Sequence, residues 1–152
     1  MTDMGEYTTA KLQEIKRDFF SYRNGIVAEA LRKLYKPGKI IFGLTVPQFI
    51  EMGKKYPKDN NLGRILWEDN TSREARLFSL YLIKPEGIDL PAAKKMVQDV
   101  VSTEEAEFLS FKVLARMPNA KTVYETLSTE DFQNPFSLHC LHMLKKNVYP
   151  VS

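Results

Sequence analysis

The stretch Thr45-Val46-Pro47-Gln48 carries the signal that decides the fold of this 152-residue chain. A hydroxyl placed just before a helix accepts a hydrogen bond from a free amide, and a Gln or Glu three positions later reaches back. Proline suits the first turn, where no N–H is needed. The pattern returns at Thr71 with Glu74, Ser102 with Glu105 and, in a weaker form, Ser128 with Asp131. Each of these sites is predicted to begin a helix.

Between these starts the chain carries helical periodicity and helix breakers. One apolar stripe has helical spacing: Leu12, Ile15, Phe19 and Tyr22. Asn24-Gly25 and Lys36-Pro37-Gly38 end helices, whereas Pro91 and Asn134-Pro135 open them. The one β-like run, Ile40-Ile41-Phe42, is short and flanked by glycines, and we interpret it as an apolar loop in the core. We therefore expect eight or nine short helices and no strand.

The spacing of the start signals indicates how these helices are arranged. The signals lie 26, 31 and 26 residues apart, which fits stacked helix pairs better than a bundle of long rods. The sequence thus predicts an all-α fold, a HEAT-like or armadillo-like α-solenoid of antiparallel helix pairs. We expect one helical-repeat domain over residues 8–149, preceded by a flexible N-terminus at residues 1–7.

Composition excludes several classes of protein. Hydrophobic residues make up 43% and charged residues 27%, which indicates a folded rather than a disordered chain. A single cysteine, Cys140, excludes an internal disulfide framework and a multi-thiolate zinc site. No apolar stretch is long enough to span a bilayer, and the first residues do not resemble a signal peptide. We expect a cytoplasmic protein that does not bind membranes.

The basic residues are unevenly distributed. Residues 31–64 contain eight basic and two acidic side chains, whereas residues 77–152 contain eight basic and nine acidic ones. A local positive field attracts a phosphate backbone, although lysines near helix ends are also ordinary solvated residues. Within this segment we choose as candidate DNA-binding residues Arg32, Lys36, Lys39 and Lys54.

Other side chains offer less chemistry. His139 and His142 share a helix face, while Cys140 lies on the apolar side, so no metal site is predicted and Cys140 is expected to be buried. Lys36-Pro37-Gly38-Lys39 lacks the spacing of a phosphate-binding loop. The sequence therefore predicts neither a metal nor a cofactor.

Trp67, Arg73 and Arg76 have two interpretations each. Trp67 ends an apolar stripe and fits a packed helix junction, but it also suits a DNA-facing surface. Arg73 and Arg76 are one helical turn apart. Each of these arginines faces a ligand or pairs with an acidic side chain, and the candidate acids are Glu68, Asp69 and Asp99. We include Trp67 and both arginines among the candidate DNA-binding residues.

Two motifs resemble those of a known family. They are Phe42-Gly43-Leu44-Thr45-Val46-Pro47 and Leu66-Trp67 followed by Arg73-Glu74-Ala75-Arg76-Leu77. Together they resemble the DNA alkylation repair family of HEAT-like repeat proteins, over about residues 10–118. The resemblance implies a curved solenoid whose concave basic face holds duplex DNA, and excision of alkylated purines without flipping the base into a deep pocket.

The chain departs from that family where catalysis is concerned. The family's active glycosylases carry two aromatics and a catalytic carboxylate in a segment that corresponds to residues 103–109 here. Neither aromatic is present, and Leu109 stands near the place of the second Asp. The usual Arg after the helix-opening proline is Ile50, and the chain ends before the family's additional C-terminal repeats. Glu105 and Glu107 are left as weak catalytic candidates.

We therefore expect a non-catalytic DNA-binding HEAT-like protein that resembles the alkylation-repair family, with DNA or another polyanion as its partner. Two alternatives stay open. One is a minimal alkylpurine DNA glycosylase that releases 3-methyladenine or 7-methylguanine, using Glu105 or Glu107. The other is a helical scaffold that binds a protein partner.

Overall fold

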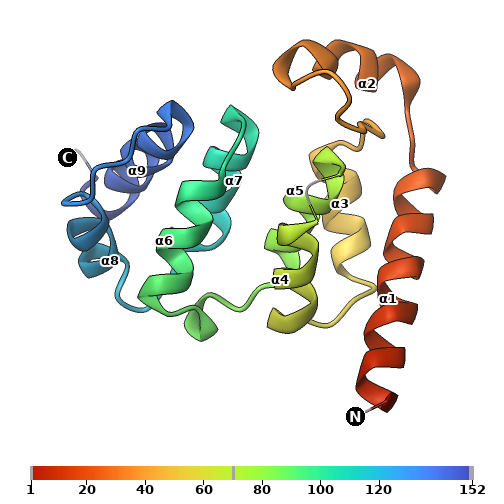
Figure 1. The fold of residues 1–152 in the computed structure, drawn as a ribbon, viewed down its shortest axis with the longest axis horizontal. Helices are drawn as coiled ribbons and strands as arrows, with labels where there is room; N and C mark the ends of the chain where they lie inside the picture. Colours follow the sequence, from red (N-terminus) through yellow and green to blue (C-terminus); the bar gives the residue numbers. More distant parts are fainter. Residues whose placement is uncertain (1, 70, 151–152) are drawn as a thin grey trace. The chain divides into compact units, whose positions relative to one another are not determined.

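The computed structural model describes residues 2–69 and 71–150, and this part of the chain is all-helical (Figure 1). Its α-helices are α1 (Thr2–Ser21), α2 (Gly25–Leu31), α3 (Val46–Gly53), α4 (Asn60–Glu68), α5 (Arg73–Leu82), α6 (Leu90–Asp99), α7 (Thr103–Lys112), α8 (Ala120–Leu127) and α9 (Pro135–Val148). Three short 3₁₀ helices are η1 (Arg32–Leu34), η2 (Pro85–Gly87) and η3 (Leu114–Arg116). The all-α prediction is confirmed. The chain divides into two compact units, residues 1–82 and 83–152.

Local chemistry starts several helices where the sequence predicts. The Thr45 N–H donates to Gln48 Oε1 at 2.9 Å, the Glu105 N–H to Ser102 Oγ at 3.1 Å, and the Phe136 N–H to Asn134 Oδ1 at 3.0 Å. Prolines occupy the first turns of α3, α6 and α9. None of the helices in the described residues combines the length and apolarity that a membrane span needs.

Two predicted starts are corrected. Helix α5 begins at Arg73, and Ser72 rather than Thr71 accepts the Ala75 N–H at 3.0 Å, so the predicted cap is one residue early. No helix begins at Ser128, because its hydroxyl donates to the Glu125 carbonyl at 2.8 Å and thereby serves the end of α8. The N-cap positions of α4, α6 and α8 are Asp59, Asp89 and Asn119, spaced 30 residues apart.

The first unit has an aromatic core. Phe19 of α1, Phe49 of α3 and Phe78 of α5 are fully buried, and their rings pack with centroids about 6 Å apart. Helix α1 is also tied to the end of α3, because Asp18 accepts hydrogen bonds from the Tyr56 hydroxyl at 2.6 Å and Lys55 at 2.8 Å. Burial and this carboxylate raise the Tyr56 pKa above its ordinary value.

Near the N-terminus, residues 2–7 form the first turns of α1, and Met1 lies outside the described residues. The loop 40–42 is only in part an apolar loop in the core, because Ile41 is buried while Ile40 is 50% exposed. Ile41 packs with Ala28, Leu31 and Tyr35, a small cluster that supports α2.

The second unit packs α6, α7, α8 and α9 around a core that contains Leu109, Val97 and Cys140. Helix α9 is joined to the end of α6 by two hydrogen bonds, from Ser137 Oγ to the Val97 carbonyl and from Asn134 Nδ2 to the Val100 carbonyl, both at 2.6 Å. Asn134 thus caps α9 and fixes its position at the same time.

Candidate functional site

A buried carboxylate, Glu74 of α5, organises the loop that carries the family-like motif. Glu74 is fully buried and accepts the backbone N–H groups of Phe42, Gly43 and Leu44 at 2.9, 3.0 and 3.3 Å. Arg73 donates to Glu74 at 2.6 Å and to the Leu44 carbonyl at 2.9 Å. A buried charge is tolerated only when it is paired and hydrogen-bonded, and these contacts meet that requirement. The loop backbone is therefore fixed by α5.

The same loop positions α2. Gly43 has φ +90°, and a Cβ at this position would lie 2.4 Å from the Asn24 carbonyl oxygen and 2.8 Å from the Ala28 nitrogen. The Asn24 N–H donates to the Phe42 carbonyl at 2.7 Å, and its side chain accepts from Ile26 and Val27 at the start of α2. Only glycine at position 43 allows the loop backbone to lie this close to the backbone of Asn24 and Ala28. The loop and the start of α2 are therefore in direct backbone contact.

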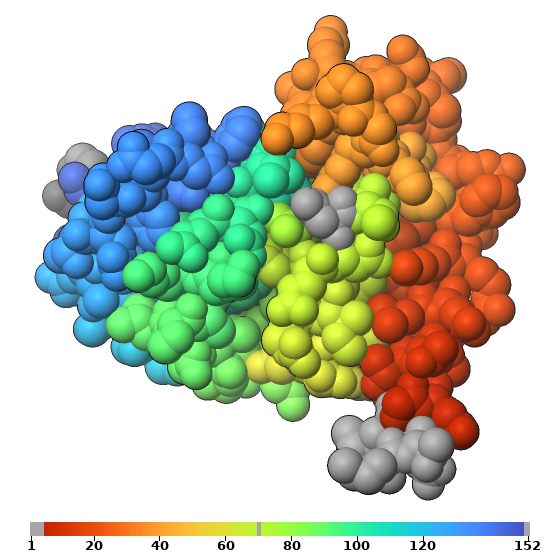
Figure 2. Space-filling view, in the orientation of Figure 1, coloured from red at the N-terminus to blue at the C-terminus, as the bar shows by residue number. Residues whose placement is uncertain are grey.

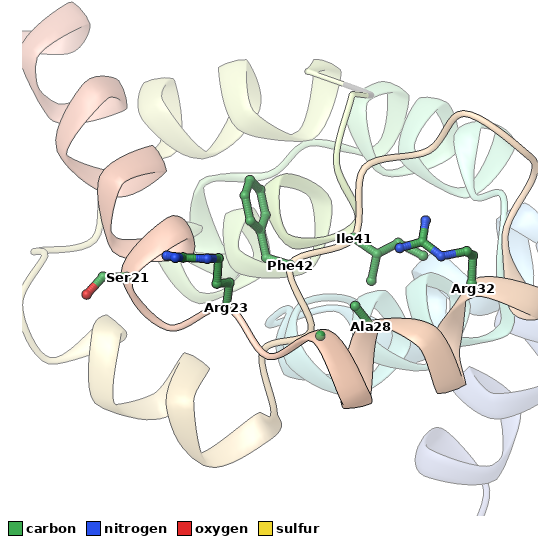
Figure 3. A pocket seen from close by; sticks show the side chains of 7 residues that line it. Ser21, Arg23, Ala28, Arg32, Ile41 and Phe42 are labelled. Atoms are coloured by element: carbon green, nitrogen blue, oxygen red, sulfur yellow. The ribbon is translucent and has the colours of Figure 1, made fainter.

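An open hollow of about 530 Å³ lies between α2, the end of α1 and this loop (Figure 3). Ala28, Ile41 and Phe42 also line it, and the side chains of Arg23 and Arg32 lie on opposite sides of it. Arg32 Nε contacts Glu29 at 3.3 Å with both side chains more than half exposed. Such an exposed pair is weak, so Arg32 is available to an anionic ligand.

More cations lie in the chain segment that carries Arg23 and Arg32. Residues 23–39 contain five basic side chains and one acidic one, and in Figure 2 this segment, in orange, projects beside α1 in red. Lys33 and Lys36 are exposed, and neither forms an ion pair within the described residues; Lys39 is half-buried. Arg32, Lys36 and Lys39, which the sequence singled out, thus belong to one chain segment, and Arg32 lines the hollow. We call Arg23, Arg32, Lys33, Lys36 and Lys39 the α2 basic surface.

Lys54 belongs to a different part of the first unit. It lies at the C-terminal end of α3 and contacts Glu51 at 3.3 Å, whereas α2 lies at the opposite end of the unit (Figure 1). Neighbouring lysines at that end serve structure: Lys55 binds Asp18, and Lys58 donates to the Tyr81 carbonyl at 3.0 Å. The basic segment 31–64 therefore separates into two groups.

Arg73, Arg76 and Trp67 lie inside the protein, with 4%, 5% and 3% of their surfaces exposed. Arg76 Nε donates to the Trp67 carbonyl at 2.6 Å, and its guanidinium lies 4.4 Å from the indole centroid. Arg73 is held by Glu74 and Leu44. Each of the three was a candidate DNA-binding residue with packing or pairing as its other interpretation, and the structure gives all three side chains contacts in the interior.

The candidate carboxylates are engaged too. Glu105 is fully buried and accepts the Val101 N–H at 3.0 Å, which is a helix-start role. Glu107 contacts His139 Nε2 at 3.0 Å. Burial raises the pKa of the Cys140 thiol to about 12, as expected for a structural cysteine. Within residues 2–69 and 71–150 no three His, Cys, Asp or Glu side chains are grouped to hold a metal.

Sequence reasoning missed Arg23, because the basic segment was taken to begin at residue 31. Arg23 lies just beyond α1 and before the α2 cap Asn24. The break at Asn24-Gly25, which the sequence shows, places it at a turn where side chains are exposed. That turn was the available signal.

The fold and the site together define an all-helical protein with an open hollow lined by two arginines, in a chain segment that also carries three lysines. No family model, curated protein or solved structure matches the chain.

Proposed function

We propose that this protein binds DNA without cutting it, through the α2 basic surface. The observation that carries the proposal is the pair Arg23 and Arg32 on opposite sides of one open hollow. Guanidinium groups bind phosphate in a bidentate manner, so two of them across one hollow suit a phosphate backbone. The neighbouring lysines add a field that attracts a polyanion.

The non-catalytic part of the proposal is supported by the carboxylates. A glycosylase needs a carboxylate aimed at the developing cationic sugar. Glu105 is enclosed and holds a backbone amide, and Glu107 is paired with His139. Residues 23–39, which carry the α2 basic surface, include Glu29 as the only acidic residue of that segment.

We further propose that the helices form HEAT-like stacked pairs, as the motif resemblance to the alkylation-repair family implies. The N-caps of α4, α6 and α8 recur every 30 residues, and the second helices of these pairs are capped at Ser72, Ser102 and Asn134. A constant interval between equivalent caps is typical of helical repeats. Small-angle scattering tests the extended, curved shape that stacked pairs require.

Fluorescence anisotropy with a labelled short duplex tests DNA binding. We expect binding at low salt whose affinity falls steeply as salt rises. Arg32→Ala and Arg23→Ala should each weaken binding and lower the slope of log affinity against log salt by about one. The matched control is Arg64→Ala, which removes an arginine of α4 with a 61% exposed side chain and should leave binding unchanged. Absence of binding at low salt, or equal losses in the control, overturns the proposal.

Incubation with methylated DNA tests the glycosylase alternative directly. The proposal expects no release of 3-methyladenine or 7-methylguanine. Release that is lost in Glu107→Gln would instead establish the enzyme and overturn the non-catalytic assignment.

A further inference from the structure

The outer side of α1 carries a second, smaller hollow that the basic surface does not include. It holds about 420 Å³ and is lined by Gln13, Lys16, Arg17 and Phe20. Arg17 is exposed and forms no ion pair with any described residue, while Lys16 contacts Asp69 at 2.9 Å. This hollow therefore also offers a cation to an anionic ligand.

An exposed aromatic and a stacked arginine link the two hollows. Phe20 lines the hollow on α1 and is 56% exposed, although its neighbour Phe19 is in the core. Arg23 lines the other hollow, and its guanidinium lies 3.9 Å from the Phe20 ring centroid. The Arg23 Nη1 also donates to the Phe20 carbonyl at 2.8 Å. This hydrogen bond holds the flat guanidinium against the ring before any ligand arrives.

A flat, preorganised pair between two cationic hollows matches the requirements of an unpaired nucleotide. Surfaces that bind single strands combine cations that follow the backbone with aromatics on which bases stack. Bases inside an intact duplex are already stacked on both faces, so their faces are closed to Phe20. An unpaired base has an open face.

We propose that the Phe20–Arg23 pair stacks with an unpaired base, so that the protein prefers DNA with unpaired nucleotides to an intact duplex. One segment of the DNA sugar-phosphate backbone lies against Arg17, and the next segment lies against Arg23 and Arg32. The inference rests on the proposed function and names its substrate class.

Anisotropy with labelled oligonucleotides tests the preference. A single strand of about 12 nucleotides, within the range of single-strand sites, is compared with the duplex of the same sequence at the same salt. We expect the single strand to bind more tightly. Phe20→Ala should weaken single-strand binding roughly 5- to 100-fold, the range measured for loss of one stacked base, and change duplex binding by less than about twofold. Phe20→Trp should retain the preference.

The matched control is Leu138→Ala, which removes a 52% exposed apolar side chain from α9 and should change neither affinity. Circular dichroism checks that each variant folds. In addition, ultraviolet crosslinking of a strand containing 5-bromodeoxyuridine should label the peptide that contains Phe20.

The outcomes separate the two proposals. If neither form of DNA binds at low salt, both proposals fail. If the duplex binds with dependence on Arg32 while Phe20→Ala leaves single-strand binding unchanged, the preference for unpaired bases is overturned and the proposed function stands.

Discussion

Two pairs of arginines in the first unit show how differently the same side chain is used. Arg73 and Arg76 of α5 are buried, and their guanidinium groups bind a carboxylate, two carbonyls and the face of an indole. Arg23 and Arg32 line an open hollow, and the Arg32 side chain contacts the exposed Glu29. Arginine supplies donors in a fixed planar arrangement, which suits a buried network as well as a phosphate.

This difference shows that the presence of a basic residue in a motif does not by itself indicate that the residue binds a ligand. Arg73 and Arg76 stand in the segment that carries the family resemblance, yet they hold the protein together. Arg23 stands outside both motifs and lines the hollow. The following four predictions test this contrast and the contacts around it, in order of decreasing effect on stability.

Removing the carboxylate that the internal network needs should have the largest effect. Glu74→Ala leaves Arg73 buried without this charge and three loop amides without an acceptor, so we expect a loss of about 3–5 kcal/mol in the free energy of unfolding. Urea denaturation followed by Trp67 fluorescence measures it. The control is Glu68→Ala, an exposed glutamate, with an expected change within about 0.5 kcal/mol. Similar losses for both variants would contradict the role of Glu74.

Two glycines of one loop separate backbone strain from steric clash. Gly43→Ala forces a side chain into a positive φ and against backbone atoms of α2, with an expected cost of about 2–4 kcal/mol. Gly38 has φ +91° but no atom within 4 Å of the added Cβ, so Gly38→Ala should cost only about 1–2 kcal/mol. Equal costs in thermal or urea denaturation would mean that the loop and α2 are not in close contact. Gly43→Ala should also weaken DNA binding, since it displaces the hollow.

Replacing one arginine of each region by alanine compares the internal arginines with those that line the hollow. Arg76→Ala removes the hydrogen bond to the Trp67 carbonyl and the stacked guanidinium, which should destabilise the protein by about 2 kcal/mol. Arg32→Ala should change stability by less than about 0.5 kcal/mol and yet weaken DNA binding. Paired measurements of urea denaturation and anisotropy give both values. If Arg76→Ala instead reduces only binding, the assignment of internal and external roles is reversed.

The smallest effect concerns pH and Asp69, which joins α4 to α1. Burial by itself would raise the Asp69 pKa, but hydrogen bonds from Thr71 and Lys16 outweigh it and hold the pKa below its ordinary value. The resulting stabilisation is present above a pH of about 4 and is lost as the pH falls through the lower pKa of the folded protein. Asp69→Asn should cost about 1 kcal/mol at neutral pH. The difference from wild type should disappear in denaturation measured in acid; a difference that grows in acid would contradict it.

Local chemistry explains what the sequence predicts well. Thr45, Ser102 and Asn134 start helices because their partners are two or three residues away, and the prolines report the first turns directly. The predicted cap of α5 was one residue early because Thr71 and Ser72 both carry a hydroxyl group that can accept a helix amide. The predicted start at Ser128 was wrong, since a hydroxyl can serve either end of a helix.

Contacts across the chain explain what the sequence could not predict. Glu74 fits a capping box in the sequence, but its oxygens bind amides about 30 residues away. The burial of Arg73 and Arg76 depends on the same long-range packing. The lysines of residues 31–64 count as one basic segment in the sequence, whereas α3 carries Lys54 to the end of the unit away from α2.

Glu74 binds the 42–44 segment through amide groups, which every residue except proline possesses. The anchoring of this segment is consequently independent of which side chains it bears, apart from the glycine at 43. Substitution of the exposed residues on α2 can alter charge and ligand preference while the supporting main chain keeps its course. Evolution can thus change the exposed side chains of α2 without changing the main chain that supports them.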